Sequence, residues 1–149
     1  MLEWMSAADR AEFERRAHSL IQQYGDYEAA PGQHLDGELT IGENIADNSG
    51  LAIAFEAYQR ALRRSHAPQG ERPDGQSADQ RFFLGFARTW VSEPIRTAAD
   101  ARQALADTHA PDRFRVIGAV ANQDAFYRAF DVQPGDRMFI PQDRRTRIW

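Results

Sequence analysis

The chain has 149 residues, of which 42% are hydrophobic and 27% charged. These values are ordinary for a soluble globular protein, and the length suits one domain over residues 1–149 or the end of a larger one. The net charge of −4 argues against nucleic acid or an anionic membrane as a partner. No apolar run approaches 18 residues, so the sequence contains no membrane span. The chain has no cysteine, which excludes disulfides, thiolate metal ligands and cysteine nucleophiles.

The hydrophobic pattern predicts a mainly α-helical chain. Ser6, Ser77 and Thr97 each precede a helical pattern and are typical N-cap residues. Residues 25–39 hold three glycines and a proline and are expected to form a loop, and residues 66–77 a surface linker. The C-terminal Trp149 indicates that the tail docks on the body of the protein. The helices are expected over residues 6–24, 40–64, 78–91, 98–106 and 122–130.

The second predicted helix begins with two carboxylates four residues apart, Glu43 and Asp47. At this spacing the two side chains leave a helix on the same face, one turn apart. The residues that continue this face are apolar or small, and a carboxylate is costly there unless a cation meets it. A zinc ion with histidine ligands would be such a cation.

A capping interpretation of the same residues stays open. Thr40 and Glu43 fit the S/T-x-x-E capping box, and the helix dipole favours acids in a first turn. Asp47 lies too far into the helix to cap it, and the run of residues 48–50 (Asn-Ser-Gly) is unusual inside a helix. Small residues at these positions would let another backbone or a ligand come close.

A second candidate segment surrounds Pro111, which ends the preceding helix. His109 is expected on the turn and Arg115 just past it. A histidine and an arginine on an irregular segment can stabilise an oxyanion and hold a carbonyl. The alternative is a surface ion pair with Asp107 or Asp112.

Several segments together resemble the C-terminal part of the neprilysin and endothelin-converting-enzyme family of zinc metalloendopeptidases. They occur in the same order over almost the whole chain, which makes the match more specific than any single motif. The matching segments are residues 23–25 (QYG), 32–35 (GQHL), 42–48 (GENIADN), 81–83 (RFF) with Trp90, 109–111 (HAP), 114–118 (FRVIG) and the closing RIW.

The resemblance implies a role for each candidate residue. Glu43 matches the family's third zinc ligand, and Asp47 matches the acid that holds a ligating histidine by its free ring N–H. His109 matches the histidine that supports the oxyanion, and Arg115 the arginine that holds a substrate carbonyl. Asp107 is expected to orient one of these two. The implied fold is the helical C-terminal portion of a thermolysin-like (gluzincin) catalytic domain.

One departure from the family limits what this chain can do. The HExxH sequence, with two zinc-binding histidines and the general-base glutamate, is absent. In family members this sequence lies upstream of the segment that matches Met1, so the chain is expected to be truncated after it. A zinc site needs three protein ligands, and Glu43 is one. The zinc site is therefore expected to be incomplete, and the chain alone inactive.

These observations leave different functions open. The first is the C-terminal portion of a zinc metalloendopeptidase that hydrolyses small peptides, with the missing HExxH portion as its partner. The alternative is a non-catalytic module that binds peptides or a partner protein. A helical domain without such a site is a third, and it requires Glu43 and Asp47 to face solvent.

The resemblance and the absence of cysteine also bear on location and association. A bacterial-type soluble protein of the cytoplasm or periplasm is expected, because cysteines of secreted animal members have no counterpart here. Truncation predicts that the helix face bearing Glu43 and Asp47 borders a groove without its opposite wall. Self-association or poor solubility would follow from the exposed apolar surface.

Overall fold

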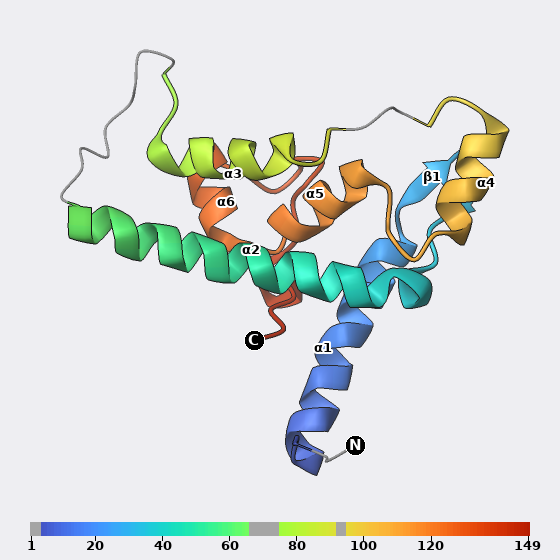
Figure 1. Cartoon of the computed structure of the whole chain (residues 1–149), viewed down its shortest axis with the longest axis horizontal. Coiled ribbons are helices and arrows are strands. Elements are labelled where there is room, and N and C mark those ends of the chain that lie inside the picture. The colour runs from blue at the N-terminus through green and yellow to red at the C-terminus, as the bar shows by residue number, and fades with distance from the viewer. Residues whose placement is uncertain (1–3, 66–74, 92–94) are drawn as a thin grey trace.

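The structure is a computed structural model that describes residues 4–65, 75–91 and 95–149 (Figure 1). It is mainly helical, as predicted. Within the described residues the helices are α1 (Ala7–Gly25), α2 (Gly37–Ser65), α3 (Ala78–Arg88), α4 (Ala98–Ala106), α5 (Asp112–Val120), α6 (Asp124–Phe130) and the 3-10 turn η1 (Gln142–Arg144). The linker expected at 66–77 lies mostly outside the described residues. None of the described helices is both long and apolar enough to cross a bilayer.

Three helix starts follow the predicted caps. The side chain of Ser6 accepts a hydrogen bond from the Asp9 backbone N–H and begins α1. Ser77 and Thr97 do the same for α3 and α4, in each case as part of a reciprocal capping box. These contacts satisfy backbone donors that have no partner inside the helix.

The prediction of a loop over residues 25–39 was wrong in two respects. Strand β1 (Glu28–Ala30) pairs antiparallel with β2 (Gln33–His34) in a short hairpin. Helix α2 then begins at Gly37, three residues before the predicted start, because the Asp36 carboxylate accepts from the backbone N–H groups of the two residues after Gly37. A Cβ at Gly37 would overlap the Ile21 carbonyl of α1, so a glycine is required at this close approach.

The start of α2 at Gly37 also removes the capping role predicted for Thr40. Thr40 lies inside the helix and is buried. Its hydroxyl donates to the Asp36 carbonyl and accepts from the side-chain amide of the buried Asn44. Glu43 therefore lies in the second turn of α2 and needs another explanation.

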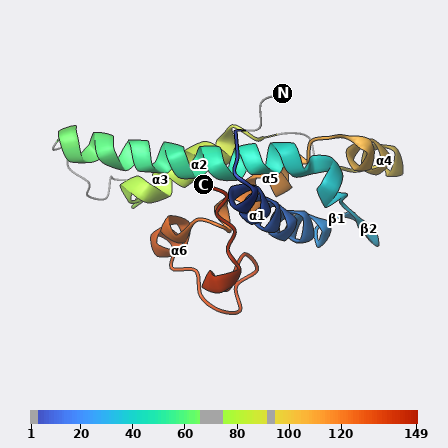
Figure 2. The same ribbon diagram turned by 90° about the horizontal axis from the view of Figure 1, so that it is seen from below.

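Helix α2 extends across the molecule, and α1 and α5 pack against it (Figures 1 and 2). Helix α1 crosses its N-terminal half, α5 packs against its middle, and α3 packs against α6. Helix α5 contributes to both hydrophobic clusters of the core: Phe114 belongs to the cluster with Leu20 and Tyr24, and Ala119 to the cluster with Phe83. Because both clusters hold it, α5 is a well-anchored platform for Arg115.

The C-terminal tail docks on α1. Trp149 stacks on Phe13 with a distance of 5.6 Å between ring centroids, and Arg16 donates to the Ile148 carbonyl at 3.0 Å. Ile148 itself is buried.

Candidate active site

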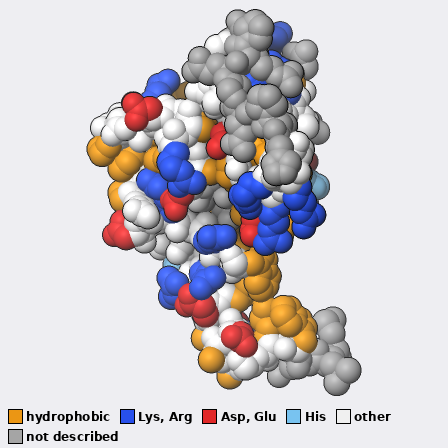
Figure 3. All heavy atoms as spheres, turned by 90° about the vertical axis from the view of Figure 1, so that its left-hand side faces the viewer, with side chains coloured by type: hydrophobic (Ala, Val, Ile, Leu, Met, Phe, Trp, Pro, Cys, Tyr) orange, Lys and Arg blue, Asp and Glu red, His pale blue; other side chains and the backbone are white. Residues whose placement is uncertain are grey.

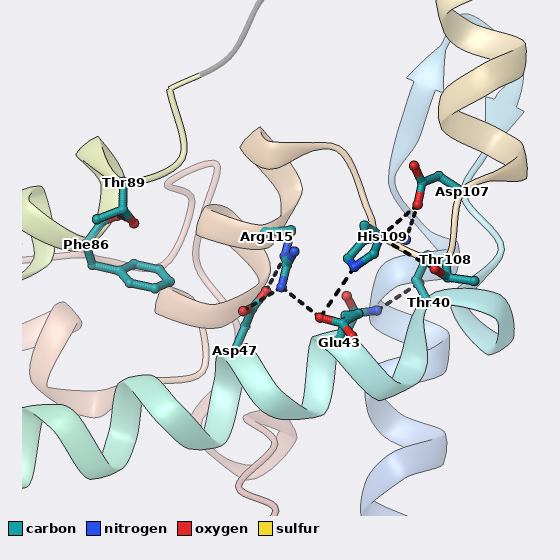
Figure 4. Close-up of polar contacts among 10 residues, drawn as sticks. Thr40, Glu43, Asp47, Phe86, Thr89, Asp107, Thr108, His109 and Arg115 are labelled. Atoms are coloured by element: carbon teal, nitrogen blue, oxygen red, sulfur yellow. Dashed lines mark hydrogen bonds and ion pairs between the residues drawn. The ribbon is translucent and has the colours of Figure 1, made fainter.

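Glu43 and Asp47 leave the same side of α2 and both meet Arg115 of α5 (Figure 4). The Nε of Arg115 donates to Asp47 Oδ2 at 2.6 Å, and its Nη2 donates to Asp47 Oδ1 at 2.9 Å. The same Nη2 donates to Glu43 Oε2 at 3.2 Å. Residues 68 and 72 positions apart in sequence are thereby joined in one charged cluster.

The environment of Arg115 is largely closed. The residue is 8% exposed, and the ring of Trp90 lies 4.0 Å from its guanidinium carbon, a favourable cation–π contact. Burial disfavours the charged guanidinium, but the hydrogen bond to Asp47 and the charges of Asp47 and Glu43 raise the pKa of Arg115 above its usual value. The cation that meets the two acids in this structure is therefore this arginine.

Arg115 holds the two carboxylates unequally. Asp47 has both oxygens bound, and its side chain is 9% exposed. Glu43 has a single, longer bond to the guanidinium, and its side chain is 43% exposed. Bidentate arginine–carboxylate pairs are strong and directional, whereas a partly exposed single contact contributes little. Asp47 is thus fixed, and Glu43 is comparatively free to bind another group.

His109 lies on the segment between α4 and α5 and faces Glu43. Its Nδ1 is 2.9 Å from Asp107 Oδ1, and its Nε2 is 3.7 Å from Glu43 Oε2. Because a carboxylate only accepts, Nδ1 carries the proton and Nε2 points toward Glu43. Hydrogen bonds from the backbone N–H and the side chain of His109 lower the pKa of Asp107, so this carboxylate stays charged and orients the ring.

Arg115 lies just past the turn at Pro111, as expected, but in a helix and not on an irregular segment. Helix α5 begins directly after Pro111, whose carbonyl accepts from the Arg115 backbone N–H. In the described residues its side chain pairs with Asp47 and Glu43 rather than with Asp107 or Asp112.

The sequence analysis assigned no role to the residues that hold α5 against α1. Gly118, less than one turn after Arg115, packs on the phenol ring of the fully buried Tyr24. The carbonyl of Gly118 accepts from the side-chain amides of Gln23 at 3.1 Å and Asn122 at 2.8 Å. The one available signal was the glycine itself, since a glycine within an apolar helical run often marks a close approach.

An apolar groove of about 400 Å³ opens beside Asp47, between α2 and α3. Ala46, Gly50 and Ala54 form one wall, and Phe82 and Phe86 form much of the other. A Cβ at Gly50 would meet no atom within 4 Å in the described chain. The small residues of α2 therefore border open space here.

The described residues do not by themselves fit a zinc ion. No group of three or more His, Cys, Asp or Glu side chains in the described residues is placed to hold a metal. Zinc takes three or four protein ligands, and beside Arg115 Glu43 and the facing His109 are half-exposed, which is fewer than zinc needs.

Comparisons with known proteins agree with the resemblance read from the sequence. A sequence model described as Peptidase family M13 matches residues 1–146. Endothelin-converting enzyme 1 of Homo sapiens is 36% identical over 147 residues, which cover 98% of this chain and 18% of that protein. Neprilysin of Homo sapiens is 30% identical over 151 residues, covering 100% of this chain and 20% of that protein.

Solved structures give the same result for the fold. The crystal structure of the Mycobacterium tuberculosis zinc metalloprotease Zmp1 in complex with an inhibitor is 42% identical and superposes with a TM-score of 0.89. The match covers 100% of this chain and 23% of that one. The chain thus spans about a fifth of the length of the curated relatives it matches.

Proposed function

The chain belongs to peptidase family M13, and from that membership we propose that it forms part of the catalytic centre of a zinc-dependent metalloendopeptidase that hydrolyses small peptides. The observation that carries the proposal is that Arg115 binds Asp47 through two short hydrogen bonds and Glu43 through a single longer one. One carboxylate is locked to a buried arginine, and the other, on the same helix face, remains half-exposed.

In this proposal Glu43 supplies one zinc ligand, and a polypeptide with an HExxH sequence supplies the others. The described residues cannot make up the ligand set alone. Asp47 accepts from the ring N–H of a ligating histidine while it keeps Arg115, since each carboxylate oxygen has a second lone pair. This arrangement requires both acids on one face of α2, as they are.

Arg115 and His109 are proposed to contact the substrate. Arg115 uses Nε and Nη2 for the two carboxylates, and within the described residues its Nη1 makes no hydrogen bond. The two N–H groups of Nη1 remain available for a substrate backbone carbonyl. The ring of His109, oriented by Asp107, directs Nε2 toward Glu43, where a protonated nitrogen would stabilise an oxyanion.

A second candidate is a non-catalytic module that binds peptides or a partner protein. It is favoured by one observation: Arg115 already meets both carboxylates and His109 faces Glu43, so the cluster has partners without a metal. In that case Nη1 of Arg115 would hold a bound peptide that is never cleaved.

Complementation with a family member's upstream portion, produced separately and bearing HExxH, distinguishes the two candidates. Zinc retained after dialysis and hydrolysis of a fluorogenic peptide are measured for each part and for the mixture. We expect both signals in the mixture alone and their loss with Glu43→Gln. The matched control is Glu38→Gln, which changes an exposed acid in the first turn of the same helix. A mixture that binds peptide without zinc or cleavage would favour the second candidate, and an unaffected Glu43→Gln mixture would contradict the assigned ligand.

We also propose that the apolar groove between α2 and α3 makes the chain self-associate. The groove is lined mainly by small and aromatic residues. Ile53, which directly precedes the lining residue Ala54 on α2, is 63% exposed. Light scattering of concentrated protein is expected to detect dimers. Ala54→Glu should remove them and Ala57→Glu, on the same helix but outside the groove lining, should not. A monomer at high concentration would contradict this proposal.

A further inference from the structure

A second, larger groove lies between α1 and the C-terminal tail and is separate from the Arg115 cluster. Its volume is about 670 Å³, within the range of ligand-binding clefts. Ile117 of α5 and Ala121 directly after it line the groove, whereas Arg115 leaves the same helix toward α2. The groove is therefore distinct from the candidate active site.

The groove concentrates positive charge in an acidic protein. All 18 basic residues of the chain are arginines, and the net charge is −4. Six of these arginines line the groove, against two acids, Asp26 and Asp143. The six are Arg15, Arg16, Arg137, Arg144, Arg145 and Arg147. Figure 3 shows the side of the molecule that includes the C-terminal end of α2; basic side chains gather across its middle, with acidic ones lying singly between them, and they are not confined to the groove.

Half of these arginines have anionic partners within the chain. Arg15 and Arg16 both bind Glu12, and Arg145 pairs with Asp124 at 2.6 Å. Arg137, Arg144 and Arg147 are exposed, and their side chains form no hydrogen bond or ion pair with any described residue.

One stretch of the remaining lining is apolar. Met138, Phe139, Ile140 and Pro141 run along the tail side of the groove, opposite the polar side of α1. A bare phosphate would satisfy the guanidinium groups but leave these residues in water. An extended peptide with alternating acidic and apolar side chains would cover both kinds of surface, since arginine binds carboxylates well and apolar area gains from burial.

We propose that this groove binds an acidic peptide segment, with Arg137, Arg144 and Arg147 on its carboxylates and the residues from Met138 to Pro141 under its apolar side chains. Binding here requires neither zinc nor cleavage, so the proposal goes beyond the function proposed above and does not depend on it.

Fluorescence anisotropy with a labelled hexapeptide, Glu-Phe-Glu-Leu-Glu-Phe, tests the proposal. The peptide Gln-Phe-Gln-Leu-Gln-Phe has the same shape without charge and is the ligand control. The protein variant is Arg137→Glu with Arg144→Glu. Its control is Arg63→Glu with Arg64→Glu, which makes the same change of net charge at the exposed C-terminal end of α2.

The acidic peptide is expected to bind at low ionic strength and to weaken as salt is added, because the contacts are exposed charges. The groove variant should bind it at least about tenfold more weakly, and the α2 variant should bind as the unchanged protein does. Equal binding of the neutral peptide, or equal loss in both variants, would overturn the proposal. It would also be overturned if inorganic tripolyphosphate bound in the groove and the peptide did not. All these measurements are of binding, so their failure leaves the complementation result unaffected.

Discussion

Replacing Gly118 with alanine tests whether the packing of α1 against α5 places Arg115 in the cluster. A Cβ at this position would overlap the Tyr24 ring, with even the farther carbon Cε2 at 2.8 Å. Tyr24 is fully buried, so the ring has no free space into which it could turn. The clash must be relieved by movement of α5 away from α1.

The expected cost follows from two opposing effects. Inserting a methyl group into a filled core costs about 1–3 kcal/mol. Alanine is favoured over glycine inside a helix by about 0.5–1 kcal/mol, which offsets part of that cost. The Gly118→Ala substitution should therefore lower the free energy of unfolding, measured with urea, by about 1–2 kcal/mol. Gly85→Ala is the matched control, because a Cβ on this residue of α3 meets no atom within 4 Å and should stabilise the protein.

The same substitution should disturb the cluster. Arg115 lies less than one turn before Gly118, and its Nε is 2.6 Å from Asp47 Oδ2. A shift of α5 lengthens this bond, which can be followed by the NMR signal and exchange rate of the Nε–H group. Adding Tyr24→Phe removes the hydroxyl oxygen, the atom closest to the new methyl group, and should recover part of the stability. If Gly118→Ala were as stable as the unchanged protein with an unaltered Arg115 signal, the packing argument would be refuted.

Three further predictions concern single contacts. Asp47→Asn leaves the buried charge of Arg115 without its bidentate partner and should lower the free energy of unfolding by about 3 kcal/mol, measured with urea. An unchanged unfolding midpoint would contradict it. Hydrogen bonds from two arginines lower the pKa of Glu12 to about 2, so the contribution of these pairs to stability is present above about pH 4.3 and is lost as the pH falls through about 2. A carboxyl NMR titration with a midpoint near 4.3 would show that the pairs do not form. Trp90→Leu removes the ring over the guanidinium and should cost about 1 kcal/mol in thermal or urea unfolding. Val91→Ala, at a residue 82% exposed, should cost almost nothing.

Helix starts were predictable where they depend on neighbouring residues. Ser77 and Thr97 cap their helices through contacts three residues away, and such contacts can be read from spacing. The start of α2 was not predictable in this way. Gly37 resembles a turn residue in the sequence; Asp36 caps the helix that begins there, and α1 passes too close to Gly37 for any side chain.

In the candidate site, too, contacts between residues close in sequence were predictable, and contacts between distant residues were not. The shared face of Glu43 and Asp47 follows from helical spacing, and the contact of Asp107 with His109 spans two residues. The pairing of Arg115 with Asp47 spans 68 residues and exists because α5 packs across α2. No local pattern contains that information, which is why an ion pair with a nearby aspartate was the open alternative for Arg115. The assigned roles of these residues remain predictions.

The charge balance of the cluster bears on which function the chain serves. Arg115 compensates Asp47 through two short bonds, and the pair is nearly neutral and mostly buried. Glu43 then carries the remaining negative charge, exposed enough to receive a cation from outside. If the cluster served only as a structural ion pair, Glu43 would add a single, partly exposed contact that contributes little to stability. In the proposed function Glu43 receives a cation from outside, and a zinc ion completed by another polypeptide has the required charge and ligand preference.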